Sequence, residues 1–240
     1  MVKSSRGRVI RLIFVGFLWL VAVANLLIGA SWYLSLGIAV AGGFILLGGR
    51  RIFRAAVTRS GDEVVCRYIP WYEGNAYSGA VLLPLMGIVA VGAGFAPGNP
   101  AWLRFAGFTL LAVFPVALWG LITMWRKCLL RITPTGLTVR LAEGPSGLID
   151  ISREQVVSIE PNRAPAPVVG ESLQAEIAYR TADSGHETTK VLLGFRLTVE
   201  PTNLVDALIV WRNGGHDDPR QLMDQIEQIL DGRSTTVSPS

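Results

Sequence analysis

The chain has 240 residues, of which 50% are hydrophobic and 17% are charged, and its mean hydropathy is +0.42. An ordinary soluble domain carries about 25% charged residues, so this composition excludes a wholly soluble protein. The 26 Gly and 13 Pro occur without a period, which excludes a collagen-like repeat. Cys66 and Cys128 lie too far apart for a CxxC metal pair or a disulfide-rich scaffold. We therefore expect a membrane protein with a soluble part.

Positive charge is unevenly distributed along the chain. Residues 1–126 hold 11 basic residues and three acids, whereas residues 127–240 hold 11 basic residues and 15 acids. A pI of about 9.4 is compatible with nucleic-acid binding, but a nucleic-acid binder needs its basic residues on one folded face. Here they cluster at the ends of apolar runs, which indicates membrane topology first and contact with anionic lipid second. We expect membrane lipids, and no nucleic acid, as partners.

Four apolar segments predict membrane helices. Residues 12–49 contain no charge, which suffices for two spans of about 20 residues each, divided at Gly29–Tyr33, where an aromatic pair suits the membrane interface. A second uncharged stretch, 79–96, precedes the turn-forming Pro97–Pro100 and a last apolar run. The prediction is four transmembrane helices paired as two hairpins, at about 11–30, 33–49, 79–96 and 104–125.

Basic residues flank these segments on one side only. The positive-inside rule therefore predicts a multi-pass protein of the plasma (inner) membrane with both termini and the middle loop in the cytoplasm. Ala22-Val23-Ala24 mimics a signal-peptide cleavage site, but the apolar run continues past it, which favours a retained signal anchor. The flanking residues are Lys3, Arg6, Arg8 and Arg11 before the first segment, Arg50, Arg51 and Arg54 after the second, and Arg126 and Lys127 after the fourth.

The apolar segments contain prolines and small residues but no internal acid or base. Ion-coupled carriers usually need charged groups within the membrane, which argues against a stand-alone transporter. Pro84 and Pro115 predict kinks whose backbone groups neighbouring helices satisfy. The small-residue spacings Gly37–Ala41 and Ala90–Gly94 permit close helix packing, either within the chain or against another subunit.

After Trp125 the sequence changes to the period-two alternation of β-strands. A hairpin is expected over 128–141 with its turn at Pro134–Gly136. Pro161–Pro167 and Asp183–His186 are expected to be loops. Further strands are expected at 147–151, 155–160, 173–181 and 189–197.

Two helices are expected near the end of the chain. Thr202 or Asn203 caps the first, and Pro219 opens the second. Residues 232–240 are expected to be disordered. The apolar faces are Leu204, Ala207, Leu208 and Trp211 in the first helix, and Leu222, Ile226, Ile229 and Leu230 in the second.

Six short antiparallel strands followed by a helix form a small bent sheet or barrel that the helix closes at one end. This order, with the hairpin Ile132-Thr133-x-x-Gly136-Leu137-x-Val139 directly after an apolar helix, resembles the pleckstrin-homology-like (PH-like) domains attached to membrane spans in bacteria. The resemblance implies a cytoplasmic α+β PH-like domain at 127–212 and a C-terminal helix at 213–231, after a four-helix region at 1–126. The whole chain resembles actinobacterial-type four-span membrane proteins with a cytoplasmic PH-like domain. Some proteins of this kind, such as lipid uptake coordinator-like proteins, are accessory subunits of envelope lipid importers.

The middle loop, 50–78, shows similarity to the start of the soluble part. Val57–Gly61 and Val64–Arg67 match Ile132–Gly136 and Leu137–Arg140, and each pair follows an apolar hairpin and a basic cluster. Turn chemistry alone can place Gly in two unrelated hairpins, so chance similarity is the alternative. If the repeat is real, residues 52–72 add strands to the same sheet.

Sequence motifs for catalysis or metal binding are lacking. His186 and His216 have acidic neighbours but no His-x-x-x-His or Cys-x-x-Cys spacing, and no GxSxG, P-loop, GxGxxG-helix or HExxH motif occurs. We therefore expect no enzyme, no catalytic residue, no metal and no cofactor. A small membrane enzyme is the alternative, with Arg54, Tyr72 and Glu73 as its best candidates.

The candidate functional residues are the basic groups Arg50, Arg51, Arg54, Arg126 and Lys127. They serve either as topology determinants alone or as contacts to lipid phosphate or a partner protein. The acidic balance of residues 127–240 favours protein contact for the soluble part. The leading hypothesis is a non-enzymatic accessory or stabilising subunit of a larger cell-envelope membrane complex, with lipid transport as its process. The alternative from another class is an autonomous anionic-lipid sensor.

Overall fold

A computed structural model describes residues 5–47, 52–140, 148–166, 170–180, 188–194, 197–214 and 218–233. The chain divides into two compact units. The helical unit comprises Met1–Arg51 and Gly74–Leu121, and the sheet unit comprises Ile52–Glu73 and Ile122–Ser240. Most of the middle loop therefore belongs to the same unit as the C-terminal part. The sequence predicted a single boundary at residue 126, whereas each unit consists of two separate segments of the chain.

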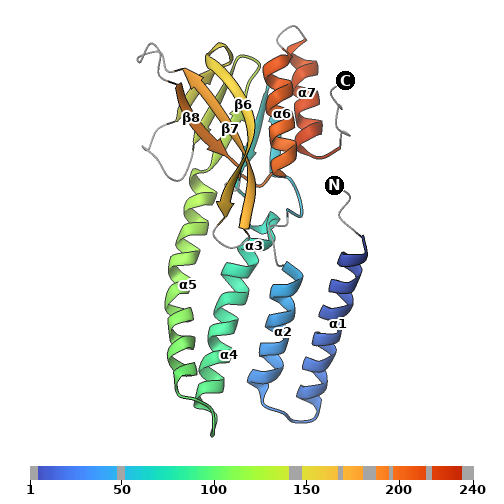
Figure 1. Ribbon diagram of the computed structural model, residues 1–240, viewed down its shortest axis with the longest axis vertical. Coiled ribbons are helices and arrows are strands. Elements are labelled where there is room, and N and C mark those ends of the chain that lie inside the picture. Colours follow the sequence, from blue (N-terminus) through green and yellow to red (C-terminus); the bar gives the residue numbers. More distant parts are fainter. Residues whose placement is uncertain are drawn as a thin grey trace. The chain divides into compact units, whose positions relative to one another are not determined.

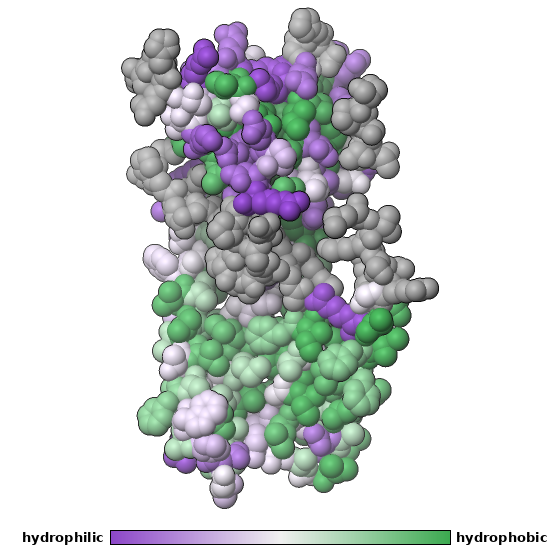
Figure 2. All heavy atoms as spheres, viewed as in Figure 1, coloured by the Kyte–Doolittle hydropathy of each residue, from purple (hydrophilic) through white to green (hydrophobic). Residues whose placement is uncertain are grey.

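The helical unit contains helices at each of the four predicted places (Figure 1). Three of them, Val9–Leu27, Gly74–Phe95 and Trp102–Lys127, are long and apolar enough to cross a membrane. The helix Trp32–Leu47 is apolar but shorter. Figure 2 shows hydrophobic residues over most of the visible face of this unit. The helices are α1 (Ser5–Leu27), α2 (Trp32–Leu47), α3 (Gly74–Tyr77), a π-helical turn (Ser78–Leu82), α4 (Leu83–Phe95) and α5 (Trp102–Lys127), whose last turns lie in the sheet unit.

Glycines allow the helices of this unit to approach closely. A Cβ at Gly107 in α5 would lie 2.6 Å from the backbone nitrogen of Val91 and 2.7 Å from the carbonyl oxygen of Gly87, both in α4. A Cβ at Gly37 in α2 would lie 3.1 Å from the Val89 side chain. The small residues therefore pack helices within the chain, as one of the two alternatives predicted.

Two arginines satisfy carbonyl groups at the ends of neighbouring helices. Nε of Arg11 donates to the carbonyl oxygen of Ile45 at 2.5 Å, near the end of α2. Nε of Arg104 donates to the carbonyl oxygen of Gly94 at 2.5 Å, near the end of α4, and its guanidinium lies 4.4 Å from the centroid of the Phe95 ring. The last carbonyls of a helix lack intrahelical partners, so these bonds stabilise both helix ends.

The sheet unit contains two antiparallel sheets. The middle loop contributes two strands to the first sheet, because Val64 pairs with Ile132 and Arg67 pairs with Leu129. This pairing confirms that residues 52–72 add strands to the sheet of the C-terminal part. The first sheet is β1 (Val57–Ser60), β2 (Glu63–Arg67), β3 (Leu129–Ile132), β4 (Gly136–Arg140) and β5 (Ile149–Ser152), and the second is β6 (Val156–Ala166), β7 (Gly170–Arg180) and β8 (Thr188–Leu193).

Helices α6 (Pro201–Asn213) and α7 (Pro219–Leu230) pack side by side (Figure 1) and share one core with both sheets. Trp211 of α6 is fully buried, and its indole Nε1 donates to the carbonyl oxygen of Thr133 at 2.7 Å. The Asp218 side chain caps α7 by accepting from the backbone N–H of Arg220. The predicted apolar faces of both helices are confirmed as buried or partly buried.

The predicted loop at Pro161–Pro167 is wrong for Pro161–Ala166, which continue β6. The reason lies in the sheet order, since β6 is an edge strand with β7 on one side only. Pro161 and Pro165 are four residues apart, so their nitrogens face the same side of the strand, and an edge strand tolerates proline where no ladder hydrogen bond is needed. Pro167, the predicted turn at Asp183–His186 and residues 234–240 of the predicted disordered tail lie outside the described residues.

Candidate membrane-interface site

Three segments that flank apolar helices meet in the sheet unit. The backbone N–H of Phe53 donates to the carbonyl oxygen of Tyr72 at 2.8 Å, and Ile52 and Glu73 form an antiparallel bridge. The ring of Trp71, in the short 3₁₀ helix Pro70–Tyr72, meets that of Trp125 edge-on, with 5.1 Å between centroids. The chain just after α2, just before α3 and at the end of α5 is therefore joined by backbone and ring contacts.

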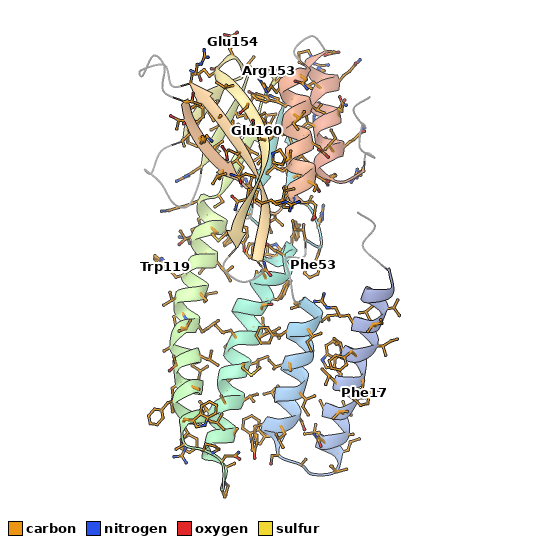
Figure 3. All side chains as sticks on the ribbon, viewed as in Figure 1. Phe17, Phe53, Trp119, Arg153, Glu154 and Glu160 are labelled. Atoms are coloured by element: carbon orange, nitrogen blue, oxygen red, sulfur yellow. The ribbon has the colours of Figure 1, made fainter. Side chains whose placement is uncertain are left out.

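Exposed aromatic side chains accompany these contacts. Phe53, labelled in Figure 3, is 56% exposed, Trp71 is 50% exposed and Trp125 is 45% exposed. The guanidinium of Arg54 lies 5.5 Å from the centroid of the Tyr72 ring, within the range of a cation–π contact. Aromatic rings with an apolar body and exposed edges are typical of the membrane–water interface.

The structure brings three of the five predicted basic residues into this part of the sheet unit. Arg54 is exposed beside Tyr72, and Arg126 and Lys127 are exposed at the end of α5. The chain of contacts Tyr72–Trp71–Trp125 connects their segments. Arg50 and Arg51 lie outside the described residues.

Two arginines that sequence reasoning missed lie at the same end of the sheet. Leu129 pairs with Arg67 of β2 on one side and with Arg140 of β4 on the other. Directly paired residues point to the same face of a sheet, so both arginines flank Leu129 on the outer face, opposite the buried Leu130. The signal available in the sequence is the internal similarity, because these arginines end the matched segments Val64–Arg67 and Leu137–Arg140.

We call Arg54, Arg67, Arg126, Lys127 and Arg140 the basic cluster. Arg54 is included because it lies two residues before Ala56, whose carbonyl oxygen accepts a hydrogen bond from the backbone N–H of Arg67 at 3.1 Å. All five side chains are exposed. By contrast, Arg131, on the same sheet face, forms an ion pair with Glu63 at 3.3 Å. The arrangement can bind anions by charge and by guanidinium hydrogen bonds.

Of the three residues weighed for catalysis, Arg54 and Tyr72 are in contact, whereas Glu73 is buried. Glu73 is only 3% exposed, and its backbone takes part in the bridge to Ile52. A cavity of about 470 Å³ lies beside Arg54, but much of its charge is paired, since Asp231 pairs with Arg233 at 3.4 Å and Glu227 pairs with Arg59 at 3.8 Å. Its lining consists of Ile52, Phe53, Arg54, Ala55, Val57, Glu200, Asn203, Glu227, Leu230, Asp231 and Arg233.

The thiol of Cys66 is buried in the core of the sheet unit. Burial raises the pKa of the Cys66 thiol to about 12, and the nearby Asp231 carboxylate adds to this shift, so the thiol stays protonated at neutral pH. Within the described residues no three His, Cys, Asp or Glu side chains form a group able to hold a metal ion. Both histidines, His186 and His216, lie outside those residues.

Comparison with protein families, curated proteins and solved structures finds no match to this chain. The fold itself defines a coarse class. Among the described residues, it combines three helices long enough and apolar enough to span a membrane with an antiparallel sheet unit that incorporates a loop between apolar helices.

Proposed function

We propose that this protein is a non-enzymatic accessory subunit of a larger cell-envelope membrane complex, with four spans and a cytoplasmic PH-like domain that docks a partner. One observation carries the proposal. The sheet unit is built from both the middle loop and the C-terminal part, so the chain passes between this unit and apolar helices three times: from α2 to β1, from β2 to α3 and from α5 to β3.

The number of chain connections to a domain bears on how it binds a partner. A single flexible linker leaves a tethered domain free to sample many positions, whereas three short connections restrict it. Restriction lowers the entropy lost on binding, and a preorganised surface therefore suits a stabilising subunit. Three connections therefore favour docking within a complex over capture by a mobile tail.

The PH-like assignment rests on the order of elements. Two antiparallel sheets are followed by α6, whose Trp211 is buried with both of them in one core. Sheet edges and helix grooves are the usual binding surfaces of such a domain. Edge strand β6 carries Pro161 and Pro165, which block strand addition, so β8 is the better edge for a partner.

The remaining parts of the proposal follow from topology and resemblance. Basic groups at the ends of α2 and α5 support cytoplasmic termini in a plasma (inner) membrane. The resemblance to lipid uptake coordinator-like proteins supports lipid transport as the process.

The test is a mild-detergent pull-down of the tagged full-length protein from its native membrane, with mass spectrometry of the recovered proteins. A tagged unrelated multi-span protein is the control for non-specific recovery. We expect a membrane transport complex in stoichiometric amount, and reciprocal recovery of this chain when a subunit of that complex carries the tag. Recovery of the protein alone as a monodisperse species would contradict the accessory role.

A further inference from the structure

We propose that the basic cluster is a binding site for the phosphate groups of anionic lipid headgroups. This proposal does not depend on the accessory role. It rests on five cationic side chains of the sheet unit, two of which, Arg67 and Arg140, are identified by the strand register.

Two cations of the cluster lie on strands β2 and β4, on either side of β3. Arg67 and Arg140 flank Leu129 at a separation of two strand spacings, about 10 Å. Lys127 precedes Leu129 by two residues and is the last residue of α5. Guanidinium groups at such spacing can each contact a phosphate, and Arg matches phosphate geometry through paired N–H donors.

None of the five residues of the cluster forms an ion pair within the described part of the chain. The opposite end of the first sheet differs, because Arg59 forms ion pairs with Asp224 and Glu227, and Arg131 forms one with Glu63. Exposed cations are thus retained at the end of the sheet next to the apolar helix α5.

The neighbouring side chains favour a membrane over a soluble anion. Between Arg104 in its first turn and Arg126 in its last turn, the helix α5 contains no charged residue. Trp71 and Trp125 are half-exposed at the same place, and tryptophan prefers the headgroup level of a bilayer. Aromatic rings for the interface and cations for phosphate therefore occur together, and near an anionic leaflet each basic residue strengthens binding about fivefold.

The test compares lipid binding by the full-length protein in neutral detergent, using native mass spectrometry during titration with phosphatidylglycerol or phosphatidylcholine. The variant is Arg67→Gln/Arg140→Gln. The matched control is Arg180→Gln/Arg220→Gln, which removes two exposed cations from the same unit. Both control positions lie outside the strands of the cluster. Arg180 pairs with Thr188 in the second sheet, and Arg220 lies in the first turn of α7, where its carbonyl oxygen accepts from Arg59.

We expect preferential binding of phosphatidylglycerol to the wild type and to the control. Affinity should fall about fivefold for each charge removed in the Arg67/Arg140 variant, and Arg67→Lys/Arg140→Lys should recover most of the loss. Thermal melting of every variant checks folding. Should the Gln variant melt early, Arg126→Gln/Lys127→Gln at the exposed end of α5 provides the same comparison.

Three results would overturn the proposal. The first is equal binding of the two lipids by the wild type. The second is an equal loss of affinity in the cluster variant and the control, which would indicate net charge alone. The third is displacement of phosphatidylglycerol by millimolar inorganic phosphate, which would indicate a site for the soluble anion.

Discussion

The backbone N–H of Ile69 donates a hydrogen bond to Oγ1 of Thr198 at 2.8 Å, although 129 positions separate the two residues. Thr198 is fully buried. Its backbone N–H donates to the carbonyl oxygen of Arg67 at 3.2 Å, and its own carbonyl oxygen accepts from the backbone N–H of Ala56 at 2.8 Å. Thr198, which lies just before α6, therefore links the middle loop to the C-terminal part of the sheet unit by three hydrogen bonds.

Thr198→Val should destabilise the sheet unit by about 1–3 kcal/mol. The substitution keeps the side-chain shape but removes the hydroxyl, leaving the Ile69 N–H without its acceptor. Thermal unfolding in detergent measures the effect, and Thr198→Ser, which keeps the hydroxyl, should cost less. Equal melting of the wild type and Thr198→Val would contradict this account of how the loop is held.

Gly107→Ala should loosen the packing of α4 against α5. The new Cβ would approach the backbone nitrogen of Val91 to 2.6 Å, and backbone atoms cannot move aside as a side chain can. Such overpacking costs about 1–3 kcal/mol, which a lower melting temperature in detergent would report. Gly120→Ala is the matched control, because a Cβ there meets nothing within 4 Å and the helix gains about 1 kcal/mol in propensity. The two alanines should shift stability in opposite directions.

Arg153→Ala should weaken the docking of α6. The Arg153 guanidinium lies 5.5 Å from the centroid of the Trp211 ring and donates to the carbonyl oxygens of Pro134, Trp211 and Arg212. Losing hydrogen bonds from a charged donor costs about 1.5–3 kcal/mol. Arg153→Lys should recover only part of this stability because lysine lacks the planar fork. A Trp-fluorescence melt provides the measurement, and an Arg153→Ala variant as stable as an exposed Arg180→Ala variant would count against the prediction.

Stability should fall at alkaline pH through Cys66. Burial raises the pKa of its thiol from 9.0 to about 12 in the folded protein, so the unfolded chain loses this proton at lower pH than the folded one. The stabilising contribution is therefore complete below about pH 9 and is lost as pH rises toward 12, at up to about 1.4 kcal/mol per pH unit. Denaturant unfolding of the wild type and Cys66→Ala between about pH 8 and pH 10.5 should show a steeper decline for the wild type. Parallel curves would argue against a buried neutral thiol.

Local patterns account for much of the fold. Helices lie at all four predicted apolar segments, and six strands and two helices lie at the predicted places after Trp125. The structure supports three of the four apolar helices as long enough to span a membrane, while α2 is shorter. Apolar runs and periodicity suffice here because burial of one face depends on residue spacing within a single element.

The error at Pro161–Ala166 has a different origin. Proline normally predicts a break, but its effect depends on whether the backbone nitrogen faces a neighbouring strand. Whether β6 has one neighbour or two is a property of the sheet, and no local pattern contains it.

The residues of the candidate site also fall into two groups, those that local sequence predicts and those that depend on the sheet. Arg54, Arg126 and Lys127 are recognisable from sequence because they lie next to apolar runs, and chain proximity alone identifies them. Arg67 and Arg140 join them only through the pairing of β2, β3 and β4, since the register places residues distant in sequence on either side of Leu129.

The sequence by itself determined the apolar helices, the strands and the position of basic residues along the chain, because these depend on neighbours in sequence. Only the tertiary structure decided that the middle loop completes the sheet and that the cations of the basic cluster share one end of it, because long-range hydrogen bonds select the strand partners.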